Sequence, residues 1–169
     1  MLKNDTNRYE NVRSVAFTGR RPSLWFLRAQ GLKIRRIWLE KKVGVGNAGS
    51  GAFANCELFF NHLGIWDRVE RNAMGYNDAA AAFGNKQLDA FWFFTAFPSG
   101  AVIMAAQTND IGLIDLGAWA RNSGFFEKYP YFTKLSVPAG TYHGVDYEAP
   151  SFQDSTLWVA SSETPADLV

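Results

Sequence analysis

The sequence predicts an α/β protein in which a mainly parallel sheet is covered by helices on both faces. From residue 41 onward, apolar segments of strand length alternate with segments of helical pattern, as expected when helices connect parallel strands. Residues 88–94 form a continuous apolar run, which is typical of a strand buried on both faces. A glycine-dense turn at residues 44–51 joins a short strand to a helix, a connection in which glycine admits backbone conformations that other residues avoid.

The expected elements of the first half follow from local signals. They are strands at 12–17, 43–45 and 69–76 and helices at 50–62 and 77–86. Ser50 is a good N-cap for the first helix and Gly64 a good stop. Within that helix the spacing of 3, 4 and 3 predicts one buried face, made by Phe53, Cys56, Phe60 and Leu63. Asn77 or Asp78 is expected to cap the second helix.

The second half continues the alternation. After the strand at 88–94, the turn at 97–100 leads into a helix at 101–107, which Pro98 or Ser99 opens. The remaining expected elements are a strand at 111–116, a helix at 119–129, an extended segment at 131–142 and a strand at 157–160. Residues 165–168 resemble the first turn of a further helix, so 161–169 is expected to be the truncated start of a C-terminal helix.

Composition narrows the class of protein. The chain has 169 residues, of which 47% are apolar and 15% aromatic, enough for one domain with a real core. No run reaches the ~20 apolar residues that span a bilayer, and the first eight residues lack the apolar core of a secretory signal. The single cysteine, Cys56, excludes a disulfide within the chain and a cysteine metal cluster. His62 and His143 lie far apart and form no ligand motif.

The net charge of +1 hides an asymmetry between two parts of the chain. Residues 1–42 hold 11 Lys and Arg against 3 Asp and Glu, whereas residues 43–169 hold 6 against 13. We therefore divide the chain into an atypical basic segment at 1–40, an α/β lobe at 41–160 and the C-terminal piece. In residues 18–40, arginine interleaves with tryptophan and aliphatic residues without a regular period. Two interpretations of 18–40 stay open: a non-native stretch, disordered or produced by a shifted reading frame, and an arm that binds phosphate or a membrane surface.

The glycine-dense turn is the clearest candidate for a binding site. A helix that begins there directs unpaired amides and its positive dipole end at the turn, which favours a small anion such as phosphate or carboxylate. The letters GVGNAG at residues 44–49 also match the dinucleotide pattern G-x-G-x-x-G. A dinucleotide site needs a longer strand before the first glycine and an acidic residue at the end of the next strand, whereas Glu70 is expected at its start. The third interpretation is a tight turn that binds nothing.

Several motifs together resemble the TRAP-associated extracytoplasmic immunogenic (TAXI) solute receptors, which are the periplasmic components of some TRAP transporters. The motifs are KVGVGNAGSG at 42–51, YNDAA at 76–80, QLDAF at 87–91, FPSGAV at 97–102, YPYF at 129–132 and VPAGTYHGV at 137–145, with VRSVA at 12–16 upstream. Their order and spacing are compatible with the family over residues 41–169. The resemblance implies one lobe of a type II periplasmic binding protein, in which two α/β lobes close over a ligand.

The resemblance also implies a ligand and a site. Family ligands are small carboxylates such as glutamate, glutamine or 2-oxoglutarate, and the partners are TRAP membrane subunits. The glycine loop would present its amides and a hydroxyl to the ligand carboxylate, and the turn after residue 96 would form the neighbouring wall. The implied ligand-binding residues are Asn47, Gly49, Ser50, Gly51, Ala52, Tyr76, Phe97, Pro98 and Ser99. A periplasmic location follows from the resemblance, although this chain shows no signal peptide.

Three departures from the family pattern qualify that expectation. Ala52 stands where the family has threonine, so one hydroxyl contact is lost. Residues 18–40 do not resemble the family segment, which runs from an aliphatic strand into a short acidic helix. The family's first lobe and the C-terminal helices have no counterpart here, so we expect weak binding by a truncated form.

The alternative function is an NAD(P)-dependent oxidoreductase that uses the loop at 44–49. We expect no enzyme, because a catalytic serine needs a neighbouring base and the spacing of the sequence gives Ser50 none. No metal, cofactor or nucleic-acid partner is expected.

Overall fold

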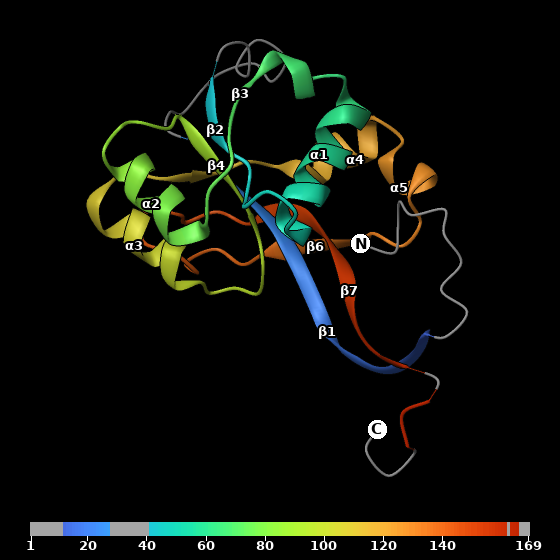
Figure 1. The fold of residues 1–169 in the computed structure, drawn as a ribbon. Helices are drawn as coiled ribbons and strands as arrows, with labels where there is room; N and C mark the ends of the chain where they lie inside the picture. Colours follow the sequence, from blue (N-terminus) through green and yellow to red (C-terminus); the bar gives the residue numbers. More distant parts are fainter. Residues whose placement is uncertain (1–11, 28–40, 162, 166–169) are drawn as a thin grey trace.

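The computed structural model describes residues 12–27, 41–161 and 163–165, and for 12–27 and 156–160 it describes the backbone. The strands are β1 (Val12–Leu27), β2 (Lys42–Gly44), β3 (Glu70–Asn72), β4 (Ala90–Phe94), β5 (Gly112–Leu113), β6 (Thr133–Val137) and β7 (Ala149–Ser161). The helices are α1 (Gly51–Leu63), the 3-10 turn η1 (Trp66–Arg68), α2 (Tyr76–Gly84), α3 (Gly100–Thr108), α4 (Leu116–Asn122) and α5 (Phe125–Lys128). Figure 1 shows α2 and α3 on one side of the sheet and α1, α4 and α5 on the other.

The alternation of side chains along β4 explains why both faces of the sheet are covered. Successive residues of a strand point to opposite faces, and all five residues of β4 are buried. Trp92 and Phe94 belong to the core cluster that contains α1, α4 and α5, whereas Phe91 and Phe93 belong to the cluster that contains α2 and α3. The expected strand at 88–94, buried on both faces, is therefore confirmed with a start two residues later.

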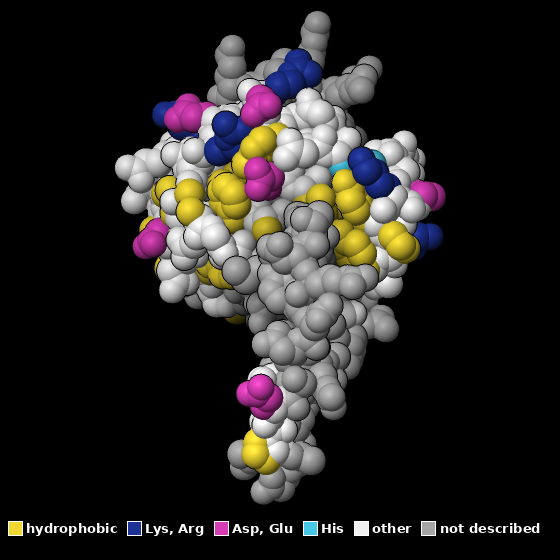
Figure 2. Space-filling model, turned by 45° about the vertical axis from the view of Figure 1, so that its right-hand side comes forward, with side chains coloured by type: hydrophobic (Ala, Val, Ile, Leu, Met, Phe, Trp, Pro, Cys, Tyr) yellow, Lys and Arg dark blue, Asp and Glu magenta, His cyan; other side chains and the backbone are white. Residues whose placement is uncertain are grey.

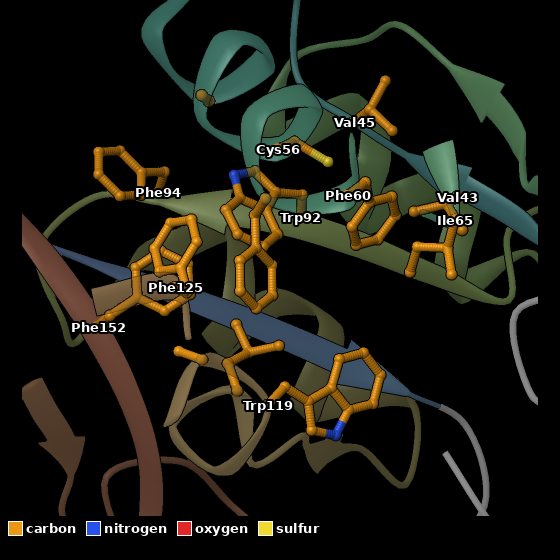
Figure 3. Close-up of a cluster of buried hydrophobic side chains, with 14 of the residues drawn as sticks. Val43, Val45, Cys56, Phe60, Ile65, Trp92, Phe94, Trp119, Phe125 and Phe152 are labelled. Carbon is orange, nitrogen blue, oxygen red and sulfur yellow. The ribbon is translucent and has the colours of Figure 1, made fainter. Parts of the chain in front are cut away.

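The core around α1 is aromatic (Figure 3). Phe59 lies at its centre, with ring centroids 4.9 Å from Phe125 and 4.8 Å from Phe152. Cys56 and Phe60 are fully buried as expected, but Phe53 and Leu63 are only partly buried. Because the face that α1 buries is wider than one stripe, Phe59 joins it although the 3-4-3 spacing omits it.

Helix ends agree with the expected signals at some positions and differ at others. Ser50 caps α1, and Gly64 ends it with φ of 67°. The cap of α2 is Gly75, so that helix begins earlier than Asn77 or Asp78 would allow. The single helix expected at 119–129 is two helices, because Gly124 with φ of 73° interrupts it. The strand expected at 111–116 is short because Asp115 already caps α4, accepting from the amide of Ala118 at 2.7 Å.

The sheet is parallel only in part, which corrects the expectation of a mainly parallel sheet. Strands β3, β2 and β4 are parallel neighbours. Around them, β1 pairs antiparallel with β4, β5 and β7, and β6 pairs antiparallel with β7. The α/β fold with a parallel unit flanked by helices is confirmed, and the antiparallel strands extend it.

Part of the segment expected at 1–40 belongs to the sheet of the lobe. Residues 12–27 form one strand that runs through this sheet, so the strand expected at 12–17 continues ten residues further. The division of the chain at residue 40 stays a prediction. Residues 28–40 lie outside the described residues. At the other end, β7 begins at Ala149 rather than residue 157, because its first half pairs with β6. The helical turn expected at 165–168 falls largely on residues outside the description.

Two searches of the described residues gave a negative result. None of their helices has the length and apolar character needed to cross a membrane. None of their His, Cys, Asp and Glu side chains gather in a group of three that could hold a metal ion.

Candidate functional site

Three helices begin at one edge of the parallel unit. Helix α1 follows β2, α2 follows β3 and α3 follows β4, and because these strands are parallel their carboxyl ends share an edge. Helix α1 packs on one face of the sheet, whereas α2 and α3 pack on the other. Neighbouring strands β2 and β4 therefore send their connections to opposite faces, which is the position where open α/β sheets bind ligands.

The glycine loop after β2 is shaped by the backbone at Gly46. Gly46 has φ of 91°, and a Cβ at this position would lie 2.9 Å from the amide nitrogen of Phe53. Both the dihedral angle and the space therefore require glycine. Gly44 has a packing reason of a different kind, since a Cβ there would lie 3.3 Å from Cβ of Ala79 on α2. Two glycines of the G-x-G-x-x-G pattern thus have structural reasons that involve no ligand.

The fold supplies no such reason for Gly51 and Gly100. Each is the first residue of a helix, α1 and α3 respectively, and each is exposed. Neither has a φ in the left-handed region, and a Cβ added to either would meet no atom within 4 Å. Alanine at a position whose backbone it can adopt restricts the unfolded chain more than glycine does, so the fold alone would favour a larger residue. A glycine at both positions is what close approach of a ligand to the backbone would select.

The first turn of α1 offers donors for an anion. The side-chain oxygen of Ser50 accepts from the amide of Phe53 at 3.1 Å, while the amides of Gly51 and Ala52 have no partner among the described residues. The first turn holds no acidic side chain that would oppose an anion. Ala52 is 7% exposed and its side chain packs in the core, so a ligand could contact this residue only through its backbone.

Tyr76 and Asn47 connect the glycine loop to the neighbouring strands. The hydroxyl of Tyr76 donates to the carbonyl oxygen of Phe94 at 2.9 Å, and its ring lies 4.4 Å from that of Phe93. A Cβ on Gly75 would lie 3.5 Å from Nδ2 of Asn47. Asn47 therefore lies beside the start of α2, and Tyr76 ties that start to the end of β4. Tyr76 is half-buried and packs against both core clusters.

The turn after β4 holds Phe97, Pro98 and Ser99, with a cis peptide bond between the first two. Ser99 caps α3 by position, but its side chain makes no capping hydrogen bond. Its backbone amide donates to the hydroxyl of Tyr142 at 3.1 Å. Phe97 packs partly against the core of α2 and α3, and Pro98 is exposed.

Tyr142 is the residue of this region that the sequence did not assign to the site. It is 3% exposed, and burial raises the pKa of its phenol above the usual value, with the hydrogen bond from Ser99 lowering it less. The hydroxyl therefore stays protonated at neutral pH. The only sequence signal was its place in the motif at 137–145, which does not indicate a partner 43 residues away.

The expected site residues thus form two connected groups. Asn47, Gly49, Ser50, Gly51 and Ala52 follow β2, and of these Asn47 lies beside the start of α2. Phe97, Pro98 and Ser99 follow β4, and of these Ser99 is bonded to Tyr142. Tyr76 stands between the groups through its bond to Phe94.

The geometry gives the dinucleotide alternative no support. Glu70 lies opposite Lys42 in the parallel register, at the amino ends of β3 and β2. It is therefore at the edge opposite the glycine loop, with its carboxylate 4.0 Å from Nζ of Lys42. The strand that should end in an acidic residue ends in Asn72. The arm expected at 18–40 lies mostly outside the described residues, so its proposed binding to phosphate or membranes stays a prediction.

The surroundings of two further polar side chains, Asp89 and His143, need no ligand to explain them. Asp89 pairs with Nζ of Lys41 at 3.2 Å and accepts from the amide of Lys42 at 3.0 Å, at the amino ends of the strands. His143 is exposed. On the face shown in Figure 2, the coloured Lys and Arg side chains lie among Asp and Glu side chains rather than in one block.

Comparison with known proteins assigns this chain to a family. The family described as NMT1-like matches residues 4–169. Among solved structures, a mutant of ArgBP from T. maritima is similar with a TM-score of 0.41 and 13% identity, over 94% of this chain and 52% of that chain. The chain thus spans about half the length of that protein. Because the family match covers nearly the whole sequence, the chain belongs to the NMT1-like family.

Proposed function

We propose that this chain is a ligand-binding lobe of an extracytoplasmic solute receptor that captures a small carboxylate such as glutamate or 2-oxoglutarate for a TRAP transporter of the TAXI type. The family supports the class of solute-binding protein. The ligand and the transporter type come from the motifs at 42–51, 97–102 and 137–145 and from the chemistry of the site. The membrane subunits of that transporter are the partners in this proposal.

One observation supports the site above the others. Gly51 and Gly100 begin the two helices on either side of the switch point, and the fold needs glycine at neither position. An anion held by main-chain amides requires the backbone to be uncovered, and a methyl group at the first helical residue would cover it. A carboxylate at the N-terminus of α1 would also gain from the helix dipole, by about 0.3–1 kcal/mol at an exposed position.

The decisive experiment separates stability from binding. We expect Gly51→Ala and Gly100→Ala to raise the free energy of unfolding by about 0.4–1 kcal/mol, because alanine restricts the unfolded chain and fits the native backbone. The same substitutions should weaken carboxylate binding at least about tenfold by covering the amides. Gly49→Ala is the matched control, since φ of 78° strains any other residue and this variant should lose stability instead.

Binding is measured by titrating a ¹⁵N-labelled chain with glutamate and 2-oxoglutarate, because amide chemical shifts detect even weak binding residue by residue. We expect the amides of Gly51 and Ala52 to shift, whereas the amide of Gly64 at the far end of α1 should not. The dimethyl ester of 2-oxoglutarate, which lacks the carboxylates, should cause no shift. Shifts with NAD that are absent with both carboxylates would favour the oxidoreductase, and binding that survives in Gly51→Ala would refute the site.

A further inference from the structure

We propose that Tyr142 is a positioning residue of this binding site, because its hydroxyl holds the amide of Ser99 and thereby fixes the turn that leads into α3. The inference rests on the proposed function, since the turn at 97–99 forms one wall of the proposed site. Tyr142 comes from a different part of the chain, the loop between β6 and β7. It acts through Ser99 and is not itself placed against the ligand.

The loop that presents Tyr142 is held by its own hydrogen bonds. The amide of Gly140 donates to the carbonyl oxygen of Val145 at 2.7 Å, and the amide of Val145 donates to the carbonyl oxygen of Tyr142 at 3.1 Å. The hydroxyl of Thr141 donates to the carbonyl oxygen of Pro138 at 2.7 Å. Tyr142 and Val145 are only 3% and 1% exposed. Because the loop is both buried at these residues and internally bonded, it is a rigid support for the turn at 97–99.

The contact between Tyr142 and Ser99 leaves the polar groups of the turn for a ligand. Tyr142 takes the amide of Ser99, while the side chain of Ser99 does not cap the helix and has no partner among the described residues. The amides of Gly100 and Ala101, which follow in the first turn of α3, likewise have none there. In α1, by contrast, the hydroxyl oxygen of Ser50 already accepts from Phe53. The bond from Tyr142 to the backbone amide of Ser99 therefore fixes the position of this residue while its hydroxyl stays available to a ligand.

A substitution of one atom tests the proposal. Tyr142→Phe keeps the ring that packs in the core of α2 and α3 and removes only the hydroxyl. We expect amide hydrogen exchange at Ser99 to accelerate at least about tenfold, and exchange at Phe53 to stay unchanged. Glutamate, as the titrated probe, should bind about five- to tenfold more weakly, which is the loss expected for one hydrogen bond. Conversely, glutamate bound to the wild type should slow exchange at Ser99, because such coupling is reciprocal.

Tyr147→Phe is the matched control. The hydroxyl of Tyr147 also bonds a backbone amide, that of Leu113 at 2.7 Å, but it supports β5 and not the turn at 97–99. This variant should lose stability without changing glutamate affinity or exchange at Ser99. An equal loss of affinity in both variants would show a general effect of stability and overturn the assignment to Tyr142.

The outcomes separate this inference from the proposed function. If exchange at Ser99 is the same in Tyr142→Phe and the wild type, the positioning role is wrong, whether or not glutamate binds. If exchange accelerates while affinity stays the same, the contact supports only the fold, and the inference also fails. If the wild type binds neither carboxylate, the proposed function fails and with it the effect on affinity, while the exchange rate at Ser99 still reports on the contact itself.

Discussion

The amide of Phe53 donates to the side-chain oxygen of Ser50 at 3.1 Å, and this bond closes the first turn of α1 directly beside the glycine loop. The carbonyl oxygen of Ser50 accepts from the amide of Ala54 at 3.0 Å, and its own amide donates to the carbonyl oxygen of Asn47 at 3.0 Å. Ser50 therefore joins the loop to the helix with three bonds. Its hydroxyl hydrogen is still available to donate to an anion.

The first prediction concerns this cap. Ser50→Ala should lower the free energy of unfolding by about 1 kcal/mol, because the amide of Phe53 loses its partner at a helix start. Ser50→Thr keeps the hydroxyl and should lose less. Urea unfolding followed by circular dichroism measures both values, and an alanine variant as stable as the wild type would show that the bond contributes nothing.

The second prediction distinguishes two glycines with similar dihedral angles. Gly46→Ala should destabilise the chain by more than about 2 kcal/mol, because the new methyl group would be strained by φ of 91° and would lie 2.9 Å from the nitrogen of Phe53. Gly49→Ala has φ of 78° but open space around the added carbon, so only the dihedral strain of about 1–2 kcal/mol remains. Equal losses in the two variants, measured by thermal or urea unfolding, would contradict the close approach of α1 to Gly46.

The third prediction uses the only cysteine of the chain. Cys56 is fully buried, and burial raises the pKa of its thiol well above the usual value, with the neighbouring Glu57 raising it further. Because the thiolate is the reactive form, a disulfide reagent should label Cys56 only when α1 leaves the core. The labelling rate should therefore rise with urea in parallel with unfolding, with the denatured chain as the fast control. Rapid labelling in native buffer would mean that α1 does not cover the sheet as described.

Much of the parallel unit could be predicted from sequence because its signals are local. A cap at Ser50, a stop at Gly64 and the apolar run that became β4 each depend on a few neighbouring residues. The high aromatic content also indicated an aromatic core. The 3-4-3 spacing omitted Phe59, because that spacing describes a narrower buried face than the one α1 has. The class of fold followed from these elements together.

The antiparallel part of the sheet was not predictable in the same way. Strand β1 pairs with β7 across more than 120 residues of sequence, from Val12 opposite Ser161 to Pro22 opposite Gln153, and no short-range pattern encodes such a partner. The basic and aromatic composition after residue 18 even argued against a regular element. For the same reason the bond between Ser99 and Tyr142 could not be predicted. It joins two loops 43 residues apart, and the local sequence of neither loop indicates the other as its partner.

The fourth prediction concerns alkaline pH and rests on that same tyrosine. Burial raises the pKa of Tyr142 in the folded chain above its usual value near 10, and the hydrogen bond from Ser99 offsets only part of the rise. Above the unfolded pKa the unfolded chain releases the proton more readily, so stability should be constant up to about pH 9 and fall from about pH 10 through the folded pKa. Tyr142→Phe cannot ionise and should lose less stability over this window.

The measurement is the difference in free energy of unfolding between the wild type and Tyr142→Phe from about pH 8 to 11. Tyr131, whose pKa burial also raises, is present in both proteins, so its contribution cancels from the difference. The stability advantage of the wild type should shrink as pH rises through the folded pKa of Tyr142, because only the wild type must keep that proton on a buried phenol. A difference that stays constant across the window would mean that the hydroxyl of Tyr142 is open to water, and the contact with Ser99 would then be too weak to hold the turn.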